Sequence, residues 1–332
     1  MGKESGPIRV AVLGLGFIGR LVARNVLRSP ELSLIGAVDA DRALAGRSLA
    51  ELLPQAPKGL RIESALAPLL KRLEGGVLLH AGGARFEEAL PVLEAAARAG
   101  VHVVSTCAEL AFPWLHYEQK AESLDQLASS REVVILGTGL NPGFVLDRLV
   151  ATAGAACGPV NRIFAERLVD VGAAPREELR RQIGLGLSEQ ELEAKADTGE
   201  VGHVGLAESA ALATVGLGLD FDEIEEELVP ILAEEDLPGS PGVKKGQVAG
   251  LFQRARGFLE NREIVCLELT IAAGLDESHD LVRLEAEPPV ELVVKGGYAE
   301  EEASAWAVVN AVARIVSAEP GLLTVLELPA GR

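Results

Sequence analysis

Three glycines and an aspartate near the start of the chain have the spacing of a dinucleotide-binding site. Gly14, Gly16 and Gly19 follow the apolar run IRVAVL and open an amphipathic segment, and Asp39 follows a second apolar run. In such a unit the first glycine permits a tight turn, the second lets the backbone approach a pyrophosphate, and the third lets the helix pack closely on the strand. A glycine-rich turn that binds nothing is the alternative. The agreement of glycine spacing, apolar runs and acid favours the dinucleotide.

The residues beside these glycines indicate which dinucleotide is expected. The N–H groups of Phe17 and Ile18, at the start of the expected helix, would point at the phosphates, whose negative charge the helix dipole favours. Asp39 would accept both ribose hydroxyls and repel a 2′-phosphate, so NAD is the expected cofactor. Arg42 is able to hold a 2′-phosphate, which leaves NADP open, and a solvated loop charge is the alternative for this residue.

Glu109 is the expected catalytic residue. It lies just beyond the apolar run VHVVS, in the stretch Cys-Ala-Glu-Leu. Hydride transfer from a substrate to a nicotinamide requires a base that accepts protons close to the reacting carbon. A carboxylate at a strand end beside the cofactor meets that need. A surface or helix-capping glutamate is the alternative interpretation.

Further residues are expected to line the cofactor, because ligands of parallel sheets bind beyond the carboxyl ends of the strands. Four of them are Ala81, Gly82, Thr106 and Cys107. Cys107 has no partner base in the sequence, so we interpret it as a small packing residue rather than a nucleophile. Asn141, after the next strand, has the donor and acceptor needed to hold a nicotinamide carboxamide, and an ordinary Asn-Pro turn is the alternative.

Alternating strands and helices must position these residues. Apolar runs and amphipathic segments alternate from residue 8 to residue 144, which predicts an α/β chain whose N-terminal Rossmann domain has a parallel sheet. Beyond Asp147 the pattern changes to strands such as IVCLELTIAAG, in which apolar and polar residues alternate. These runs predict a second α+β domain with a mostly antiparallel, open sheet.

Composition excludes several classes of protein. The 332 residues are enough for two domains, and the hydrophobic residues lie in short interrupted runs, so no membrane span is expected. A net charge of −18 without a basic block argues against nucleic-acid binding. Three scattered cysteines fit neither a disulfide framework nor a zinc site, so no metal is expected. Because the first residues lack an apolar signal region, we expect a cytoplasmic protein.

Several longer motifs resemble the 2,4-diaminopentanoate dehydrogenase family, which includes native amine dehydrogenases and has the dihydrodipicolinate-reductase-like fold. The matching segments are STCAEL (105–110), GTGLNPGFVLD (137–147), RQIGLGLS (181–188), GHVGLAES (202–209) and the tail VVNAVARIVSAEPGLLTVLELP. The paired-histidine helix and DAPSGT loop of the dihydrodipicolinate reductases themselves do not occur here, which disfavours that activity. The resemblance implies that the tail packs on the cofactor domain, so the expected domains are 1–141 with 301–332, and 142–300.

The resemblance also implies an activity, the NAD(P)-dependent oxidative deamination of an amine, reversible as reductive amination of a ketone with ammonia. The expected substrate is 2,4-diaminopentanoate, the product is 2-amino-4-oxopentanoate, and Glu109 is the base. A dehydrogenase of simple amines and a reductase of cyclic imines are enzymatic alternatives. A nicotinamide-sensing binding protein is the non-enzymatic alternative, although no helix-turn-helix or basic region is visible.

A dry pocket for a diamino acid must pair one carboxylate and two ammonium groups. The candidates for the carboxylate are Arg176, Arg180 and Arg181. Their segment, PREELRRQ, is also typical of an exposed helix with charge pairs along one side, which is the alternative interpretation. Asp170 or Glu208 is a candidate for the second ammonium.

Three more residues are candidates for substrate contacts. Phe144 and Gln182 match motifs of the resembled family, and His203 lies in an expected loop, where it could line the pocket or bond its own loop. The second domain also suggests an assembly, because its half-buried strands leave a sheet face with apolar positions. We therefore expect a homodimer formed through that domain.

Overall fold

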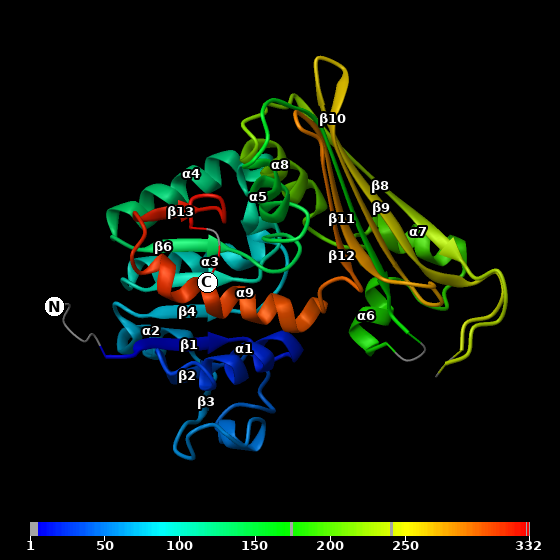
Figure 1. Cartoon of the computed structure of the whole chain (residues 1–332). Coiled ribbons are helices and arrows are strands. Elements are labelled where there is room, and N and C mark those ends of the chain that lie inside the picture. The colour runs from blue at the N-terminus through cyan, green and yellow to red at the C-terminus, as the bar shows by residue number, and fades with distance from the viewer. Residues whose placement is uncertain (1–5, 173–174, 240–241, 330, 332) are drawn as a thin grey trace. The chain divides into compact units, whose positions relative to one another are not determined.

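The computed structural model describes residues 6–172, 175–239, 242–329 and 331. The chain divides into two compact units. Unit 1 consists of Met1–Phe144 and Ala299–Arg332, and unit 2 consists of Val145–Tyr298. In Figure 1, unit 1 therefore contains the elements from the blue β1 to the green β6 together with the orange-red α9 and the red β13.

Unit 1 is built on a seven-stranded sheet with the order β13-β6-β5-β4-β1-β2-β3. The strands are β1 (Ile8–Leu13), β2 (Leu32–Val38), β3 (Ile62–Glu63), β4 (Val77–His80), β5 (His102–Ser105), β6 (Val134–Gly137) and β13 (Gly321–Leu323). Every neighbouring pair is parallel, which confirms the predicted Rossmann domain. The last strand comes from the C-terminal segment and pairs with β6, so both parts of unit 1 share one sheet.

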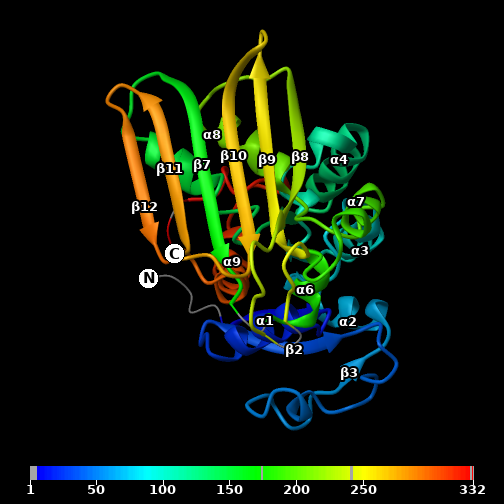
Figure 2. The ribbon, with the colours of Figure 1, turned by 90° about the vertical axis from the view of Figure 1, so that its right-hand side faces the viewer.

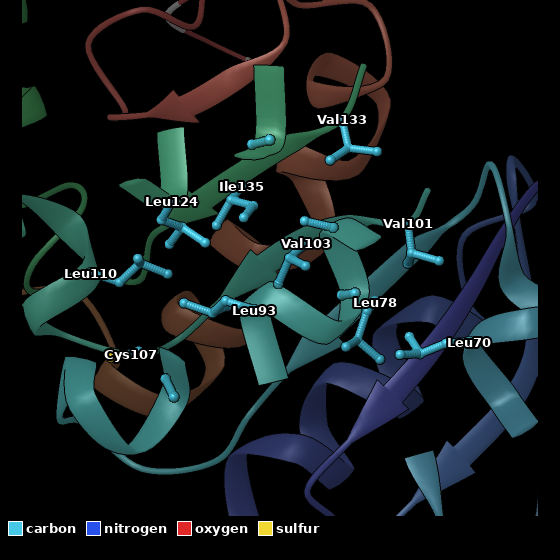
Figure 3. Packing of buried hydrophobic residues seen from close by; sticks show 14 of the residues in the cluster. Leu70, Leu78, Leu93, Val101, Val103, Cys107, Leu110, Leu124, Val133 and Ile135 are labelled. Atoms are coloured by element: carbon cyan, nitrogen blue, oxygen red, sulfur yellow. The ribbon is translucent and has the colours of Figure 1, made fainter. Parts of the chain in front are cut away.

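Helices pack on this sheet and bury its apolar side chains. They are α1 (Phe17–Leu27), α2 (Leu66–Leu73), α3 (Phe86–Arg98), η2 (Glu109–Ala111), α4 (Trp114–Ser130) and α9 (Glu300–Ile315), and a short helix, η1 (Leu49–Glu51), lies in the connection between β2 and β3. One core joins α2, α3 and α4 to the strands, with Leu78, Leu93 and Leu124 at most 1% exposed (Figure 3). Helix α9 packs alongside α1, where Arg24 and Glu302 form an ion pair of 2.6 Å.

Unit 2 contains a six-stranded sheet with the order β12-β11-β7-β10-β9-β8. The strands are β7 (Val160–Asp170), β8 (Glu223–Leu232), β9 (Val248–Leu259), β10 (Arg262–Ala272), β11 (His279–Ala286) and β12 (Val290–Lys295). Neighbouring strands are antiparallel except β7 and β10, which are parallel. The predicted mostly antiparallel sheet is therefore confirmed.

Helices of unit 2 pack against this sheet. They are α5 (Arg148–Gly154), α6 (Glu177–Gln182), α7 (Glu189–Asp197) and α8 (Leu206–Gly216). Helix α8 is buried over most of its length and packs on β8, β9 and β10, whereas α5 packs on β7, β11 and β12. In Figure 2 the strands lie in front of α8. Within the described ranges, no helix combines the length and the apolar character that crossing a membrane requires.

Candidate active site

The glycine turn between β1 and α1 has the close packing that its glycines require. Gly14 adopts a φ of 88°, and a Cβ there would lie 2.5 Å from the carbonyl oxygen of Ala81. A Cβ on Gly19 would overlap the carbonyl oxygen of Gly14, whereas a Cβ on Gly16 would have no heavy atom within 4 Å. Packing within the turn therefore requires Gly14 and Gly19, and Gly16 leaves open space before the start of α1.

The start of α1 suits a phosphate group. Gly16 is the N-cap residue and has no side chain of its own to cap this end, and the first turn carries no acidic residue. Phe17 is 39% exposed and Ile18 is half-buried. The first N–H groups of a helix lack intrahelical partners and attract anions. The residues present therefore fit the pyrophosphate of a dinucleotide.

Asp39 links the end of β2 to the glycine turn. Its Oδ2 accepts the N–H of Leu15 (2.5 Å) and its Oδ1 accepts the N–H of Asp41 (2.7 Å). Each carboxylate oxygen has about two acceptor positions, so each retains one for a ribose hydroxyl. Arg42, three residues further on, is exposed. The position of Asp39 thus suits the adenosine ribose of a dinucleotide, and Arg42 is an exposed cation close to it in the chain.

The turns that follow β4 and β5 lie side by side at the carboxyl edge of the sheet. Ala81 donates its N–H to the end of β1 (2.8 Å), and Thr106 donates to the end of β4 (2.9 Å). Cys107 is fully buried, and its thiol donates to the carbonyl of Ala84 (3.2 Å). The structure therefore brings Ala81 and Gly82 next to Thr106 and Cys107, beside the glycine turn.

His80, the last residue of β4, is a buried group that the sequence analysis missed. It is 3% exposed, and its Nδ1 lies 2.7 Å from the hydroxyl of Ser105 at the end of β5. That hydroxyl oxygen also accepts the N–H of Cys107 (3.0 Å). Burial lowers the pKa of His80 to about 4, so its ring is neutral near neutral pH. The ring supports the turn at Gly82, where a Cβ would come within 3.2 Å of Nε2.

Glu109 begins η2, just beyond β5, and is 4% exposed. Its Oε1 accepts a hydrogen bond from Nη1 of Arg85 (2.8 Å). Its Oε2 accepts the N–H of Phe86 (2.7 Å) and the hydroxyl of Tyr117 (3.2 Å). A carboxylate has about four acceptor positions, and these three donors leave one for a ligand. Because Phe86 is the first residue of α3, Glu109 also caps that helix. Glu109 therefore lies at the expected position beyond β5 and also makes the helix-capping contact that was the alternative interpretation.

Tyr117 supports this carboxylate from α4. Its backbone departs from helical angles (φ −134°, ψ 38°) and kinks the helix there. Its ring packs on Phe86 with the centroids 5.2 Å apart. Burial and the neighbouring charge of Glu109 raise the pKa of Tyr117 to about 12. The phenol therefore stays protonated at neutral pH and donates its hydrogen bond to Glu109.

Asn141 lies in a tight turn after β6, at the same carboxyl edge of the sheet. It is 8% exposed and is joined to Pro142 by a cis peptide bond. Gly143 adopts a φ of 122°, and a Cβ there would lie 2.5 Å from the backbone nitrogen of Gly139. Phe144, at the end of this turn, is half-buried. Close packing therefore fixes the backbone on both sides of Asn141.

The arginines around α6 pair with glutamates of their own segment. Arg176 lies 3.4 Å from Glu178, while Arg180 and Arg181 lie 3.7 and 3.2 Å from Glu177. The Arg181 side chain is 73% exposed, whereas that of Arg180 is 19% exposed and its Nε has no hydrogen-bond partner within the described ranges. Exposed pairs of this kind contribute little energy, and they match the alternative interpretation of this segment.

His203 and Gln182 lie in neighbouring segments of unit 2. The carbonyl of Gln182 accepts the N–H of Gly202 (2.8 Å). The Gln253 side chain accepts the N–H of His203 and donates to its carbonyl (3.1 Å). Burial and, secondarily, the charge of Arg167 lower the pKa of His203 to about 4. Its Nε2 is buried and makes no hydrogen bond to the described part of the chain, so it has capacity for a ligand or a water.

Arg167 forms a buried ion pair with Asp280 across β7 and β11. The two side chains are 1% and 2% exposed. Nη2 of Arg167 also donates to the carbonyl of Tyr298 (2.8 Å), and Oδ2 of Asp280 accepts the Tyr298 N–H (2.8 Å). This pair was not predicted from the sequence, although Arg167 is in phase with the buried residues Ile163 and Ala165 of the same strand. That period of two was the available signal.

The two acidic candidates for the second ammonium differ in their surroundings. Oδ1 of Asp170 accepts the N–H groups of Gly274 (3.0 Å) and Leu275 (3.3 Å), so this carboxylate holds a turn. Glu208 is 3% exposed within α8. Of the two, Glu208 is the acid that lies inside the core of unit 2.

Comparisons with known proteins follow the division of the chain. Residues 144–332 match the model of the 2,4-diaminopentanoate dehydrogenase C-terminal domain. Residues 10–139 match that of the saccharopine dehydrogenase NADP binding domain. A curated 2,4-diaminopentanoate dehydrogenase of Acetoanaerobium sticklandii is 26% identical over 344 residues, which cover 98% of this chain and 94% of the relative.

Solved structures share the fold of the whole chain. The amine dehydrogenase from Mycobacterium smegmatis has a TM-score of 0.85 at 20% identity and covers 98% of this chain and 97% of its own. A probable dehydrogenase from Thermotoga maritima has a TM-score of 0.58 at 14% identity, with 96% and 92% covered. Since the C-terminal model spans more than half of the sequence, this chain belongs to the 2,4-diaminopentanoate dehydrogenase family of NAD(P)-dependent oxidoreductases that act on amines.

Proposed function

We propose that this chain oxidises 2,4-diaminopentanoate to 2-amino-4-oxopentanoate and ammonia with NAD, and catalyses the reverse reductive amination. The observation that carries the proposal is the carboxylate of Glu109. It is held at the carboxyl edge of the nucleotide-binding sheet with one acceptor position left. The curated relative, itself a 2,4-diaminopentanoate dehydrogenase, covers nearly the whole chain and supports the choice of substrate.

The residues of unit 1 would act in order on the reacting amine. When bound, the nicotinamide accepts a hydride from the carbon that carries the nitrogen. Glu109 takes a proton from the substrate ammonium beforehand and releases it to solvent. It then takes a proton from the water that adds to the iminium carbon and passes this proton to the departing nitrogen. The carbon–nitrogen bond then breaks, and ammonia and the ketone are released. Tyr117 and the N–H of Phe86 keep the carboxylate in place during these steps.

The cofactor contacts follow from the turn geometry. The pyrophosphate would lie against Gly16 and the N–H groups of Phe17 and Ile18, because the glycine leaves that space open. Asp39 would take the ribose hydroxyls, which favours NAD, and the exposed Arg42 is the residue that could admit NADP. The turns after β4 and β5, together with Asn141, would contact the nicotinamide end.

The test is cofactor turnover with purified protein. NADH formation with 2,4-diaminopentanoate, and NADH consumption with ammonia and 2-amino-4-oxopentanoate, are expected. The same assay with NADP establishes the cofactor preference. Absence of turnover with every amine and ketone tried, with either cofactor, would contradict the proposal.

A dehydrogenase of simple amines is the second candidate. It is favoured by the arginines around α6, each of which lies within 4 Å of a glutamate of its own segment. Arg176, Gln182, His203 and Phe144 are still proposed as substrate contacts. A panel of plain ketones with ammonia distinguishes the two candidates. A simple-amine enzyme would aminate them about as well as 2-amino-4-oxopentanoate.

We also propose a cytoplasmic homodimer formed through the outer sheet face of unit 2. Side chains there alternate with the buried ones, and arginines lie over aromatic rings, as Arg254 does over Phe252 at 4.9 Å. Val229 and Val293, on the two edge strands, are 46% and 47% exposed. Apolar groups spread across an open sheet favour burial against a second copy. Light scattering tests this, and a monomer at micromolar concentration would contradict it.

A further inference from the structure

We propose that Arg85 binds the carboxylate of an amino-acid substrate, while Glu109 binds the ammonium group that is to be oxidised. The inference rests on the proposed function and names the residue that selects its substrate class. The sequence suggests the arginines around α6 as partners of the substrate carboxylate and gives no local signal for Arg85. Because Arg85 pairs with Glu109, it is the stronger candidate.

The Arg85–Glu109 ion pair is unequal in a way that suits exchange with a substrate. The Arg85 side chain is 45% exposed, whereas that of Glu109 is 5% exposed. Glu109 is also held by the N–H of Phe86 and the hydroxyl of Tyr117, so its carboxylate is the fixed member. Arg85 sits at the N-cap of α3 with an extended backbone, and a long, half-exposed side chain can move without disturbing the helix. Arg85 is therefore the member that a ligand can reach and displace.

The charges of this pair are complementary to those of an amino acid. Nη1 of Arg85 lies 2.8 Å from Oε1 of Glu109, so a cation and an anion lie next to each other at the carboxyl edge of the sheet. A substrate with a carboxylate and an ammonium a few bonds apart can replace this contact by two others. Its carboxylate takes the guanidinium, which binds carboxylates bidentately, and its ammonium takes Oε1. No buried charge is left uncompensated during the exchange.

The reaction itself gives Arg85 a second task. Oxidative deamination replaces the ammonium of the substrate by a neutral ketone, so Glu109 loses its positive partner when ammonia leaves. A carboxylate that is 4% exposed needs a countercharge. Renewed pairing with Arg85 supplies it and releases the carboxylate of the product. The same ion pair thus accounts for both binding and release.

Values of kcat/KM for the parent, two variants and a control, each with two substrates, test the assignment. Arg85→Gln removes the charge but keeps a polar side chain. Arg85→Lys keeps the charge but lacks the planar guanidinium that binds a carboxylate bidentately. The substrates are 2,4-diaminopentanoate and pentane-2,4-diamine, in which a methyl group replaces the carboxylate. Arg98→Gln is the matched control, since Arg98 also pairs with a glutamate on α3 and its side chain is 55% exposed.

The expected result is selective. Arg85→Gln lowers kcat/KM for the diamino acid by about 10- to 100-fold, the range for loss of a charge-assisted hydrogen bond. The value for pentane-2,4-diamine falls by a clearly smaller factor, because Arg85 also returns a countercharge to Glu109, and every value for Arg98→Gln stays within about twofold. Arg85→Lys keeps the positive charge, so it recovers part of the activity on the diamino acid and most of the activity on the diamine. Equal losses on both substrates would overturn the proposal, because they would mean that Arg85 only holds Glu109 in place.

A binding measurement tests this inference independently of the proposed function. Calorimetric titration of 2,4-diaminopentanoate into the NADH-saturated protein measures affinity without turnover. Weaker binding to Arg85→Gln than to the parent and to Arg98→Gln supports the assignment, even if the parent turns over no amine. Equal affinities for the parent and Arg85→Gln, or no binding to either, would overturn it. Thermal unfolding of each variant confirms that the folded protein is compared.

Discussion

Replacing Asp280 by Asn should destabilise unit 2 strongly. Asn keeps the shape of the side chain and can still accept the N–H of Tyr298, but it removes the carboxylate charge that pairs with the Arg167 guanidinium, whose side chain is 1% exposed. Removing one partner of a buried ion pair costs about 3–5 kcal/mol. Since a domain is stable by about 5–15 kcal/mol, this change would use a large share of the total.

The same two strands offer a matched control. Arg162 of β7 lies 3.2 Å from Glu285 of β11, but their side chains are 38% and 58% exposed. Glu285→Gln should therefore cost only about 0–1 kcal/mol. The double change Arg167→Met with Asp280→Asn removes the buried charge as well, so it should recover part of the loss seen with Asp280→Asn alone.

Amide hydrogen exchange in β7 and β11 is the assay, because it reports the local free energy of opening. A chain with two compact units need not unfold in a single step, so a global midpoint alone would be ambiguous. Faster exchange in Asp280→Asn than in Glu285→Gln, with recovery in the double variant, is expected. Equal exchange in the two single variants would refute the reasoning that burial makes this pair costly to break.

Three further predictions follow from unit 1 and from the buried histidines. Glu109→Gln should lower kcat by about 100-fold or more while NADH still quenches protein fluorescence on binding, and near-native turnover would remove Glu109 from the mechanism. Asp39→Ser should move the ratio of kcat/KM values from NAD towards NADP, with Arg42 available for the phosphate; a parent that already prefers NADP strongly would contradict this interpretation of Asp39. Burial lowers the pKa of His80 and of His203 from 6.5 to about 4. The unfolded chain therefore binds protons at these rings first, and stability is lost as the pH falls from about 6.5 to about 4, by about 2 kcal/mol per ring at about pH 5. Urea unfolding measures the free energy of unfolding at about pH 7 and about pH 5. Between these pH values His80→Gln should lose less of this free energy than the parent, and an equal loss would exclude His80 as a source of the pH dependence.

The sequence predicts the architecture of unit 1 because local signals agree there. Glycine spacing fixes the turn after β1, and alternating apolar runs and amphipathic segments indicate a parallel sheet. Once the strands are parallel, residues that follow them must share one edge. That argument is enough to group the turns after β4, β5 and β6, and the structure has them at that edge.

The partners of Glu109 could not be predicted from the same signals. Arg85 lies 24 residues earlier, in the loop after β4, and its contact depends on the paths of two loops. Periodicity describes the strands and helices but carries no information on such paths. The contact with Tyr117 depends in addition on a kink inside α4, at a position where the sequence reads as a continuous helix.

The buried ion pair of unit 2 shows a different limit. Alternation along β7 places Arg167 on the core side, yet a charged residue at such a position is normally assigned to the solvent side. Its partner Asp280 is 113 residues away, and only the pairing of β7 with β11 brings the two together. Long-range strand pairing therefore decides which charge is compensated, and a single sequence does not encode that pairing in any local pattern.

The central claim, deamination of a diamino acid, is tested most directly by comparing two substrates with the parent protein and NAD. We expect kcat/KM for 2,4-diaminopentanoate to exceed that for pentane-2,4-diamine by about 10- to 100-fold, because the diamine lacks the carboxylate that forms charge-assisted hydrogen bonds with a guanidinium. Comparable values for the two would contradict the diamino-acid assignment and favour an enzyme of simple amines.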